Sequence, residues 1–215
     1  MASASARLVH PDTRLVQLLD PPFHDTPRDP GYIRAYPPGI RENGGQYTHS
    51  AAWFGHALAG LGDGDGALQV FDIISPIRRT ENASGASHYA REPYVLPGDV
   101  YGPGQNLGLG GWSWYTGAAS WTWQLGGEAI LGLRVIDGHL AIDPCLPRQW
   151  GGFMATVRTE KGSIEVSVEN PERLGRGEIR LTVDGRPLEK PAPVPFPGPG
   201  RTSKVTALLV GPAGA

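Results

Sequence analysis

The sequence lacks the features that mark several classes of protein. Its 215 residues include a single cysteine, Cys145, which excludes an internal disulfide. There is no run of about 18 apolar residues, so we expect no transmembrane segment. The N-terminal stretch MASASARLVHPDTR has no long apolar core, so we expect no signal peptide. The net charge of -2 shows no basic excess, and we expect neither a nucleic acid nor an acidic membrane surface as a partner.

Composition nevertheless predicts a folded protein, with a large share of tryptophan. Hydrophobic residues make up 40% of the chain, which is enough for a packed core. Glycine (31) and proline (21) are frequent, and a Pro-rich segment occupies residues 191–200. Four of the six tryptophans lie close together, at Trp112, Trp114, Trp121 and Trp123. This cluster has two interpretations, core packing or stacking on sugar rings, because a flat aromatic face complements the C–H face of a pyranose.

The first 132 residues carry helical periodicity. A helix beginning at Gln46 or Thr48 is predicted to end near Gly60, and a tight GDGDG turn joins it to a second helix that stops at Ser75. The turn lacks the remaining ligands of a calcium loop, so no metal site is expected. Residues 77–91 are predicted as a polar loop. A third helix is predicted over residues 116–131, apolar on most sides and therefore buried on most sides.

After residue 132 the pattern changes to short strands. Ile164, Val166 and Val168 alternate with polar residues, as expected for a sheet with one buried face. The predicted strands span residues 133–135, 140–142, 153–158, 163–169, 178–183 and 205–210. The sequence therefore predicts an α+β chain of two domains, a helical part over 1–132 and a small antiparallel β domain over 133–215.

Two polar segments of the helical part are candidates for a binding site. His49 is expected near the start of one helix, and Thr116 with Gly117 near the start of another. Helix N-termini present free N–H groups and partial positive charge, which suit phosphate or another anion. The alternatives are a helix cap at Thr116 and an ordinary polar helix-start residue at His49.

Several segments carry a family resemblance, in order and over roughly residues 8–185: RENGGQYTHSAAW, EPYVLPGDVYG, GGWSWYTGAASW, EAILGLR and LAIDPCLPRQWGGF. Together they resemble the C-terminal part of glycoside hydrolase family 94. They are most similar to the phosphorylase-like domain at the C-terminal end of cyclic β-1,2-glucan synthases. The resemblance implies an (α/α)6 barrel followed by a β-sandwich. It also implies inverting phosphorolysis of β-linked glucosides, with inorganic phosphate as co-substrate and no cofactor.

By the same resemblance, His49, Thr116 and Gly117 match the family's phosphate-binding histidine and Thr-Gly pair. Arg41 and Glu42 lie where the family lines the sugar-acceptor side of the cleft, and Trp114 of the tryptophan cluster joins them as a sugar-binding candidate. Cellobiose phosphorylases carry a sugar-binding glutamine shortly after their EPYV segment. The corresponding residues 96–99 read LPGD, which disfavours cellobiose and favours the glucan-synthase branch.

The family's general acid, an aspartate in an Asp-Trp-Asn-Asp-Gly-type motif, has no counterpart in the sequence. We therefore expect no catalytic residue here and a chain that is inactive alone, because loss of a general acid costs about 10²–10⁴-fold. We expect the chain to be a fragment of the enzyme. Three origins of the missing barrel half stay open: encoded next door, lost, or supplied in trans by a complementing chain. Helices taken from a closed ring would also expose apolar faces.

Two competing functions stay open, a non-catalytic carbohydrate-binding module and a structural remnant without a ligand. If the chain is instead a fragment of a glycoside phosphorylase, the expected partners are a β-linked glucan or glucoside and phosphate. A cytoplasmic location is expected, and attachment of the parent enzyme to the inner membrane stays open.

Overall fold

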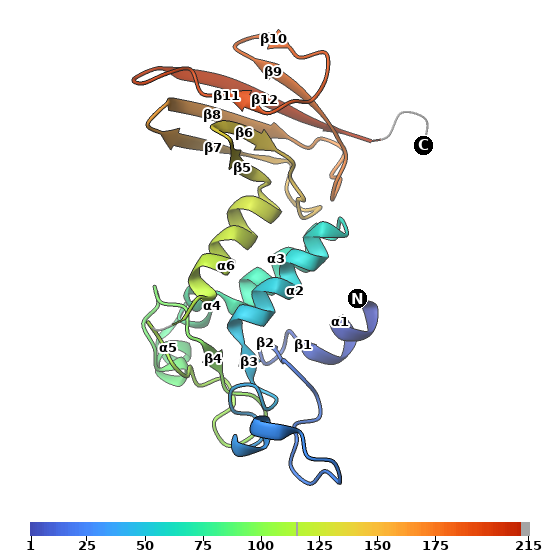
Figure 1. Cartoon of the computed structure of the whole chain (residues 1–215), viewed down its shortest axis with the longest axis vertical. Coiled ribbons are helices and arrows are strands. Elements are labelled where there is room, and N and C mark those ends of the chain that lie inside the picture. Colours follow the sequence, from blue (N-terminus) through green and yellow to red (C-terminus); the bar gives the residue numbers. More distant parts are fainter. Residues whose placement is uncertain (115, 212–215) are drawn as a thin grey trace. The chain divides into compact units, whose positions relative to one another are not determined.

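The computed structural model describes residues 1–114 and 116–211 and separates into two compact units (Figure 1). The first, called here the helical unit, comprises Met1–Leu58 and Ala67–Leu125. The second, the sheet unit, comprises Ala59–Gly66 and the described residues from Gly126 onward. Among the described residues, no helix has the length and apolar character needed to cross a membrane.

The helical unit is built mostly from short helices and two small two-stranded sheets. Its helical elements are α1 (Ala2–Leu8), the 3₁₀ helix η1 (Gly31–Ala35), α2 (Thr48–Gly60), α3 (Gly64–Ile74), α4 (Pro76–Arg79), α5 (Ala83–Tyr89) and α6 (Ala118–Gln124). Its strands are β1 (Val9–His10) with β2 (Leu15–Val16), and β3 (Gln46–Tyr47) with β4 (Asp99–Val100), each pair antiparallel. The last residues of α2 and the first of α3 belong to the sheet unit.

The predicted pair of helices is confirmed as α2 and α3. The Oδ1 atom of Asp63 accepts a hydrogen bond from the Gly66 N–H at 2.9 Å, which satisfies one of the free donors at the start of α3. Within the helical unit, α2 makes a close approach at Gly55. A Cβ atom there would lie 2.6 Å from Leu125 Cδ2 and 3.2 Å from Val70 Cγ1, so only glycine fits without a shift.

The polar loop predicted for residues 77–91 is wrong, because the segment holds α4 and α5. Pro76 opens α4, where its fixed φ suits the first helical turn. Asn82 caps α5, its side chain accepting from the Gly85 N–H at 2.8 Å. Both signals are local, but these helices are too short for a clear apolar period.

The third predicted helix exists in a different form. It begins as α6 and continues as the π-helix η2 (Leu125–Ile130). The expectation that it is buried on most sides is wrong, because the Trp123 side chain is 67% exposed. Apolar composition predicts the tendency to be buried, but which face finds a partner depends on the tertiary packing.

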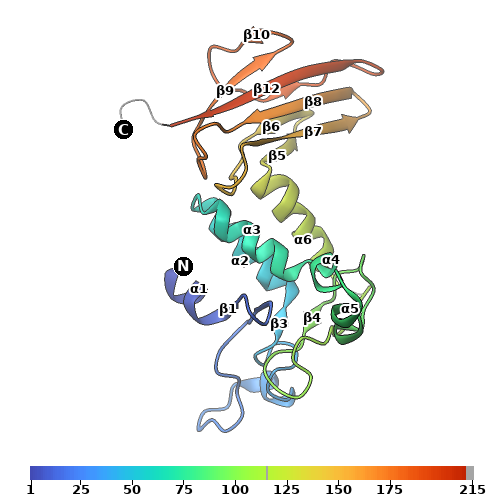
Figure 2. The ribbon, with the colours of Figure 1, turned by 180° about the vertical axis from the view of Figure 1, so that it is seen from behind.

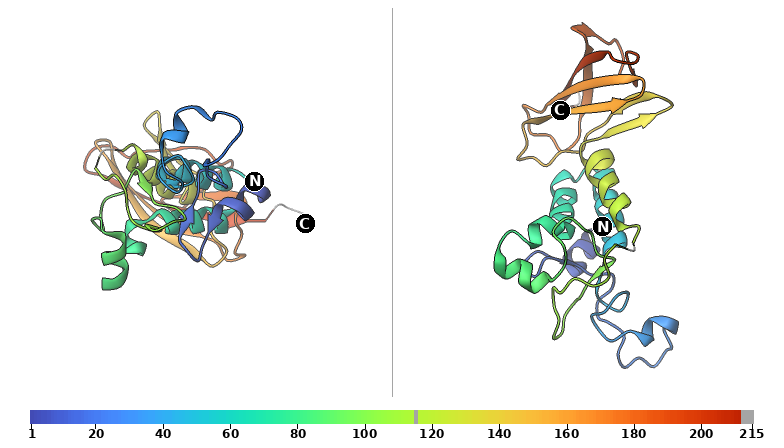
Figure 3. Two further views of the ribbon diagram at one scale, coloured as in Figure 1. Left: turned by 90° about the horizontal axis from the view of Figure 1, so that it is seen from below. Right: turned by 90° about the vertical axis from the view of Figure 1, so that its left-hand side faces the viewer.

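The sheet unit contains a five-stranded sheet in the order β10-β9-β12-β8-β7 and a three-stranded sheet in the order β11-β6-β5 (Figures 2 and 3). The strands are β5 (Leu133–Ile136), β6 (His139–Ile142), β7 (Gly152–Thr159), β8 (Gly162–Glu169), β9 (Glu178–Val183), β10 (Arg186–Pro187), β11 (Val194–Pro195) and β12 (Thr202–Val210). The six predicted strands are all present. Antiparallel pairing is confirmed except between β12 and β8, which pair in parallel.

One hydrophobic core joins the two sheets. The predicted alternation along β8 is confirmed, since Ile164, Val166 and Val168 are all buried in this core. The Pro-rich segment contributes as well, because Val194 of β11 pairs with Leu140 of β6 and is buried beside it. Proline is tolerated here because β11 is an edge strand.

Candidate functional site

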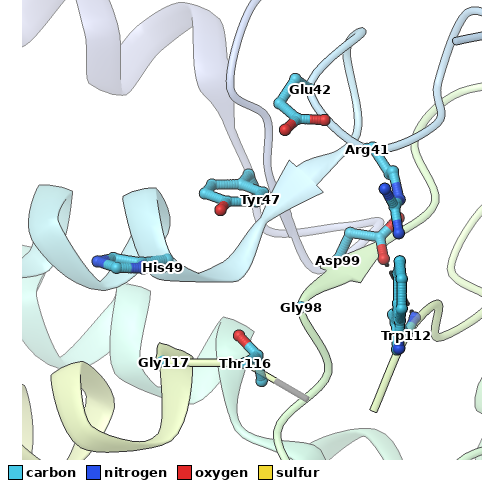
Figure 4. A pocket seen from close by; sticks show the side chains of 9 residues that line it. All are labelled: Arg41, Glu42, Tyr47, His49, Gly98, Asp99, Trp112, Thr116 and Gly117. Atoms are coloured by element: carbon cyan, nitrogen blue, oxygen red, sulfur yellow. Dashed lines mark hydrogen bonds between the residues drawn. The ribbon is translucent and has the colours of Figure 1, made fainter.

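A cavity of about 480 Å³ lies within the helical unit (Figure 4). It gathers five of the six predicted site residues, Arg41, Glu42, His49, Thr116 and Gly117, although they come from segments far apart in the sequence. The remaining lining residues are Tyr47, Gly98, Asp99 and Trp112. Trp114 is not among them.

The β3–β4 pair positions one wall of the cavity. Tyr47 pairs with Asp99 in antiparallel register, so the two side chains reach the cavity from neighbouring strands. The Thr48 N–H donates to the Gly98 carbonyl at 3.0 Å and ties the start of α2 to the start of β4. His49, the second residue of α2, is thereby held beside the sheet (Figure 4).

A tight turn carries Arg41 and Glu42. The buried Asn43 side chain braces it, donating to the carbonyls of Phe23 (2.8 Å) and Tyr36 (2.7 Å). At Gly45 a Cβ atom would lie 2.8 Å from the Arg41 carbonyl oxygen. Because glycine has no side chain, the backbone can pass close to itself at Gly45, and the turn explains why asparagine and glycine follow the charged residues.

Arg41 is held at one end of the cavity by aromatic rings. Its guanidinium carbon lies 4.3 Å from the centre of the Trp112 ring and 5.5 Å from that of Tyr36. Its Nη1 donates to the Tyr36 hydroxyl at 3.4 Å, and this bond is the main cause that raises the pKa of Arg41. The stacked geometry fixes a permanent positive charge beside Trp112.

Asp99 is a buried carboxyl group in the same end of the cavity, with only 3% of its surface exposed. Burial raises the pKa of Asp99, whereas the backbone N–H groups of Trp112 and Arg41 and the charge of Arg41 act in the opposite direction. The Trp112 N–H donates to Asp99 Oδ1 at 3.2 Å. Sequence reasoning did not include this carboxyl group in the predicted site. Its place within the EPYVLPGDVYG segment was the available signal.

His49 lies at the other end, among aromatic rings. Its ring centre is 4.7 Å from that of Trp53 in an edge arrangement and 5.7 Å from that of Trp121. Its Nε2 atom is buried and has no hydrogen-bond partner among the described residues. Buried polar atoms are normally paired, so this nitrogen leaves a hydrogen-bonding capacity unused.

Thr116 and Gly117 face His49 across this end of the cavity (Figure 4). A Cβ atom at Gly117 would lie 3.8 Å from His49 Cε1, which places the backbone of Gly117 against the imidazole. The Thr116 Oγ1 accepts from the Ala118 N–H at 3.0 Å, and Gly117 is the N-cap of α6. A hydroxyl, an imidazole and a glycine backbone thus meet in one place, a donor set that suits an oxyanion.

The tryptophan cluster does not form a core. Trp112, Trp114 and Trp123 are exposed, so the core-packing interpretation is wrong for these three, whereas Trp121 is half-buried against His49. Trp114 lies outside the cavity, where its Nε1–H donates to Glu92 Oε1 at 2.9 Å. Within residues 1–114 and 116–211 there is no group of three or more His, Cys, Asp or Glu that could hold a metal.

Comparison with known proteins identifies the family of the chain. The family model "Glycosyl hydrolase 94 superfamily, catalytic domain" matches residues 1–132, and "Glycosyl hydrolase family 65, C-terminal domain" matches residues 133–189. The cyclic beta-(1,2)-glucan synthase NdvB of Rhizobium meliloti is 44% identical over 181 residues, which cover 84% of this chain and 6% of that protein.

Two phosphorylases are more distant relatives. An N,N'-diacetylchitobiose phosphorylase of Vibrio proteolyticus is 28% identical over 89% of this chain and 24% of its own length. A 3-O-beta-D-glucopyranosyl-beta-D-glucuronide phosphorylase of Paenibacillus borealis is 29% identical over 90% of this chain and 25% of its own length. The chain thus spans a quarter or less of these relatives. Because the first family model covers more than half of its residues, the chain belongs to the glycosyl hydrolase 94 superfamily.

Proposed function

We propose that the cavity is the phosphate-binding half of a site for phosphorolysis of β-linked glucosides. His49, Thr116 and Gly117 bind inorganic phosphate in this proposal, and Arg41, Glu42 and Trp114 contact the sugar. The observation that carries it is the meeting of the first three residues around one cavity, where the His49 Nε2 has no hydrogen-bond partner in the described part of the chain. The phosphorylases among the relatives support the reaction class.

In the proposed reaction, a phosphate oxygen attacks the anomeric carbon on the face opposite the glycosidic oxygen. The C–O glycosidic bond breaks, a general acid protonates the departing oxygen, and a β-linked glucose becomes α-glucose 1-phosphate. The contribution of His49 and the Thr116-Gly117 pair is to hold the phosphate oxygens in position and to offset their charge.

Arg41 and Asp99 place a guanidinium and a carboxyl group at the sugar end of this scheme. Hydroxyl groups of a pyranose both donate and accept hydrogen bonds, so a guanidinium and a carboxyl group together suit them. Trp112 lines the cavity beside Arg41 and contributes apolar surface to this end of it.

The general acid belongs, in this proposal, to a part of the enzyme outside the present sequence, either in the same protein or in a complementing chain. We further propose that residues 1–132 form helices of an (α/α)6 barrel and that 133–215 form the domain that follows it. The glucan synthase similarity favours β-1,2-glucans as the substrate class. The cytoplasmic location stays a prediction.

The test is a thermal-shift titration of the full chain with inorganic phosphate. We expect millimolar phosphate to raise the melting temperature, since a ligand that binds only the folded state stabilises it by mass action. His49→Ala and Thr116→Ala should abolish the shift. His56→Ala is the matched control, because His56 lies on the same helix but does not line the cavity. A shift that persists in both site variants would contradict the proposal.

A second candidate is carbohydrate binding without catalysis, which the exposed Trp112, Trp114 and Trp123 favour. It predicts that sophorose or a short β-1,2-glucan stabilises the chain equally with and without phosphate. Cooperative binding of sugar and phosphate would instead support the phosphorolysis site.

A further inference from the structure

A second cavity of the helical unit, with a volume of about 570 Å³, lies where the turn between β1 and β2 meets α4 and α5. Its lining includes residues 12–14 of the turn, Arg78 and Arg79 of α4, and His88 and Tyr89 of α5. Among the described residues, it shares no lining residue with the proposed phosphate cavity. A ligand of this arginine cavity would therefore be separate from the phosphate of the proposed function.

Two hydrogen bonds hold the turn against α4. The Nη1 of Arg14 donates to the Arg78 carbonyl, and the Nη2 of Arg79 donates to the Arg14 carbonyl. The φ angle of Arg14 is 53°, in the left-handed region that residues other than glycine rarely adopt. This exchange between main chain and side chains fixes the position of the Arg79 guanidinium in the wall of the cavity.

Two of the three arginines have carboxylate partners. The Arg78 Nε lies 3.2 Å from Asp72 Oδ1 and its Nη1 lies 2.9 Å from Glu81 Oε1, while the Arg14 Nη2 lies 3.8 Å from Glu81 Oε2. Asp12 also lines the cavity, but it is exposed, so water and salt screen its charge. The exposed part of the cavity wall thus has its cations and carboxylates paired or screened.

Arg79 differs from these arginines in burial and in pairing. Only 8% of its surface is exposed, and among the described residues it forms no ion pair with a carboxylate. Its Nε atom is buried and has no hydrogen-bond partner there. Burial lowers the pKa of Arg79 to about 10, so the guanidinium is still charged at neutral pH. A buried charge without a counter-ion is costly, and an anion bound beside it would stabilise the folded chain.

Tyr89 supplies a second buried donor to the same cavity. Its ring centre lies 5.7 Å from the Arg79 guanidinium carbon, and only 1% of its surface is exposed. Its hydroxyl oxygen has no hydrogen-bond partner in the described part of the chain. Burial raises the pKa of Tyr89 to about 12, so the hydroxyl stays protonated at neutral pH and can donate a hydrogen bond.

We propose that the arginine cavity binds a small organic carboxylate, whose oxygens accept hydrogen bonds from Arg79 Nε and from the Tyr89 hydroxyl. The planar guanidinium presents its N–H groups in a fork that matches the two oxygens of a carboxylate. A single buried cation balances one negative charge, whereas a dianionic phosphate would leave excess charge buried. The volume of the cavity leaves room for the organic part of the ligand.

The test is a thermal-shift titration of the full chain with sodium acetate as the probe. Sodium chloride at the same ionic strength and pH is the reference, because it separates carboxylate binding from general screening. We expect acetate, and not chloride, to raise the melting temperature of the helical unit by a few degrees, since a ligand of the folded state stabilises it by mass action. Ligand-observed NMR of acetate gives the dissociation constant.

Two variants assign the response to the cavity. Arg79→Met removes the buried charge and should abolish the acetate shift, while Arg34→Met, at an exposed position outside the cavity, should keep it. Tyr89→Phe removes only a hydroxyl without a partner, so it decides the question if Arg79→Met does not fold. Its acetate affinity should fall about tenfold, the effect of one hydrogen bond to a charged group, and that of Tyr32→Phe, an exposed tyrosine, should not.

Equal stabilisation by acetate and chloride, or an unchanged acetate affinity in Tyr89→Phe, would overturn the carboxylate site. The proposed function fails separately. His49→Ala should lose the phosphate response and keep the acetate response, and Tyr89→Phe should keep the phosphate response and weaken the acetate response. If His49→Ala removes both responses, acetate binds in the phosphate cavity and the arginine cavity is not its site.

Discussion

The two units differ in what they bury. In the sheet unit, alternating apolar side chains of β6, β8 and β12 make one continuous core. In the helical unit, burial includes polar atoms that lack partners. All nine buried side-chain nitrogen or oxygen atoms without a hydrogen bond among the described residues belong to it, those of Gln46, Thr48 and His49 among them. Unpaired buried groups cost stability, and three of these atoms, on Glu42, His49 and Asp99, belong to residues that line the proposed phosphate cavity.

The exposed aromatic rings show the same division. The large exposed aromatics among the described residues are Tyr32, Trp53, Tyr94, Trp112, Trp114 and Trp123, all in the helical unit. The large exposed apolar side chains of the sheet unit are aliphatic, for example Met154. We infer that the sheet unit carries most of the stability of the chain and the helical unit most of its binding capacity. On this view the helical unit is the less stable of the two and melts separately.

The largest expected effect comes from the core of the sheet unit. Ile164→Ala removes a fully buried side chain from β8, which is paired on both sides, and should lower the unfolding free energy of this unit by about 2–5 kcal/mol. Calorimetry should show a lower melting temperature for the sheet unit. The transition of the helical unit, which contains five of the six tryptophans and dominates their fluorescence, should not move. Glu165→Ala, on the exposed face of the same strand, is the control. A fall of both transitions together would refute independent melting.

A smaller effect is expected from the turn between α2 and α3. In Gly64→Ala the new Cβ would collide with the backbone carbonyl of Leu146, within the sheet unit, and a destabilisation of about 1–3 kcal/mol should follow. Gly60→Ala, four residues earlier, meets nothing within 4 Å and should be neutral or slightly stabilising. Urea denaturation of both variants measures the difference, and equal stabilities would contradict the close approach of Gly64 to Leu146.

Next in size is a cap in the helical unit. Asn82→Ala removes the acceptor of the Gly85 N–H and should cost about 1 kcal/mol. Ser84→Ala, an exposed position of the same helix, should cost less than about 0.5 kcal/mol. The measurement is the tryptophan-fluorescence transition. If Asn82→Ala moves the transition of the sheet unit instead, the division into units is contradicted.

The smallest net change in the free energy of unfolding is expected from Asp99→Asn. The variant removes both the burial cost of the carboxylate and its attraction to Arg41, and these two contributions have opposite signs. The informative change is in pH dependence. The folded-state pKa of Asp99 is raised, so its contribution to stability is fully present below the unfolded value and is lost as pH rises through the folded value. Stability of the wild-type helical unit should therefore fall more over this acidic range than that of the variant. If the wild type and Asp99→Asn lose stability equally over this pH range, the raised folded-state pKa of Asp99 is contradicted.

Much of the sheet unit was predictable because its signals are local. Strand alternation has a period of two, and turn glycines such as Gly138 and Gly162 have positive φ angles as their role requires. The parallel pairing of β12 with β8 was not predictable. The partner of a strand distant in sequence depends on which strand edges of the folded sheet still have unpaired backbone groups. The strand within the Pro-rich segment escaped notice for the same reason, because Val194 becomes a core residue only through its contact with β6.

In the helical unit, single residues were easier to predict than their grouping. The motifs around His49 and Thr116 pointed to phosphate, but Tyr47, Asp99 and Trp112 were absent from the predicted site. Trp114, which was expected at the sugar side of that site, does not line the cavity, and its indole N–H donates to Glu92 instead. Short helices such as α4 and α5 were missed because one or two turns do not establish a period.

The residues and their spacing already decided the two structural classes, the turns, the helix caps and the family, because these depend on backbone preferences and on contacts within a few positions. Tertiary structure alone decided which distant side chains share a cavity, which tryptophans are exposed and which strands pair in parallel. Those outcomes depend on long-range packing, in which a side chain is buried or exposed according to neighbours that its own segment does not encode.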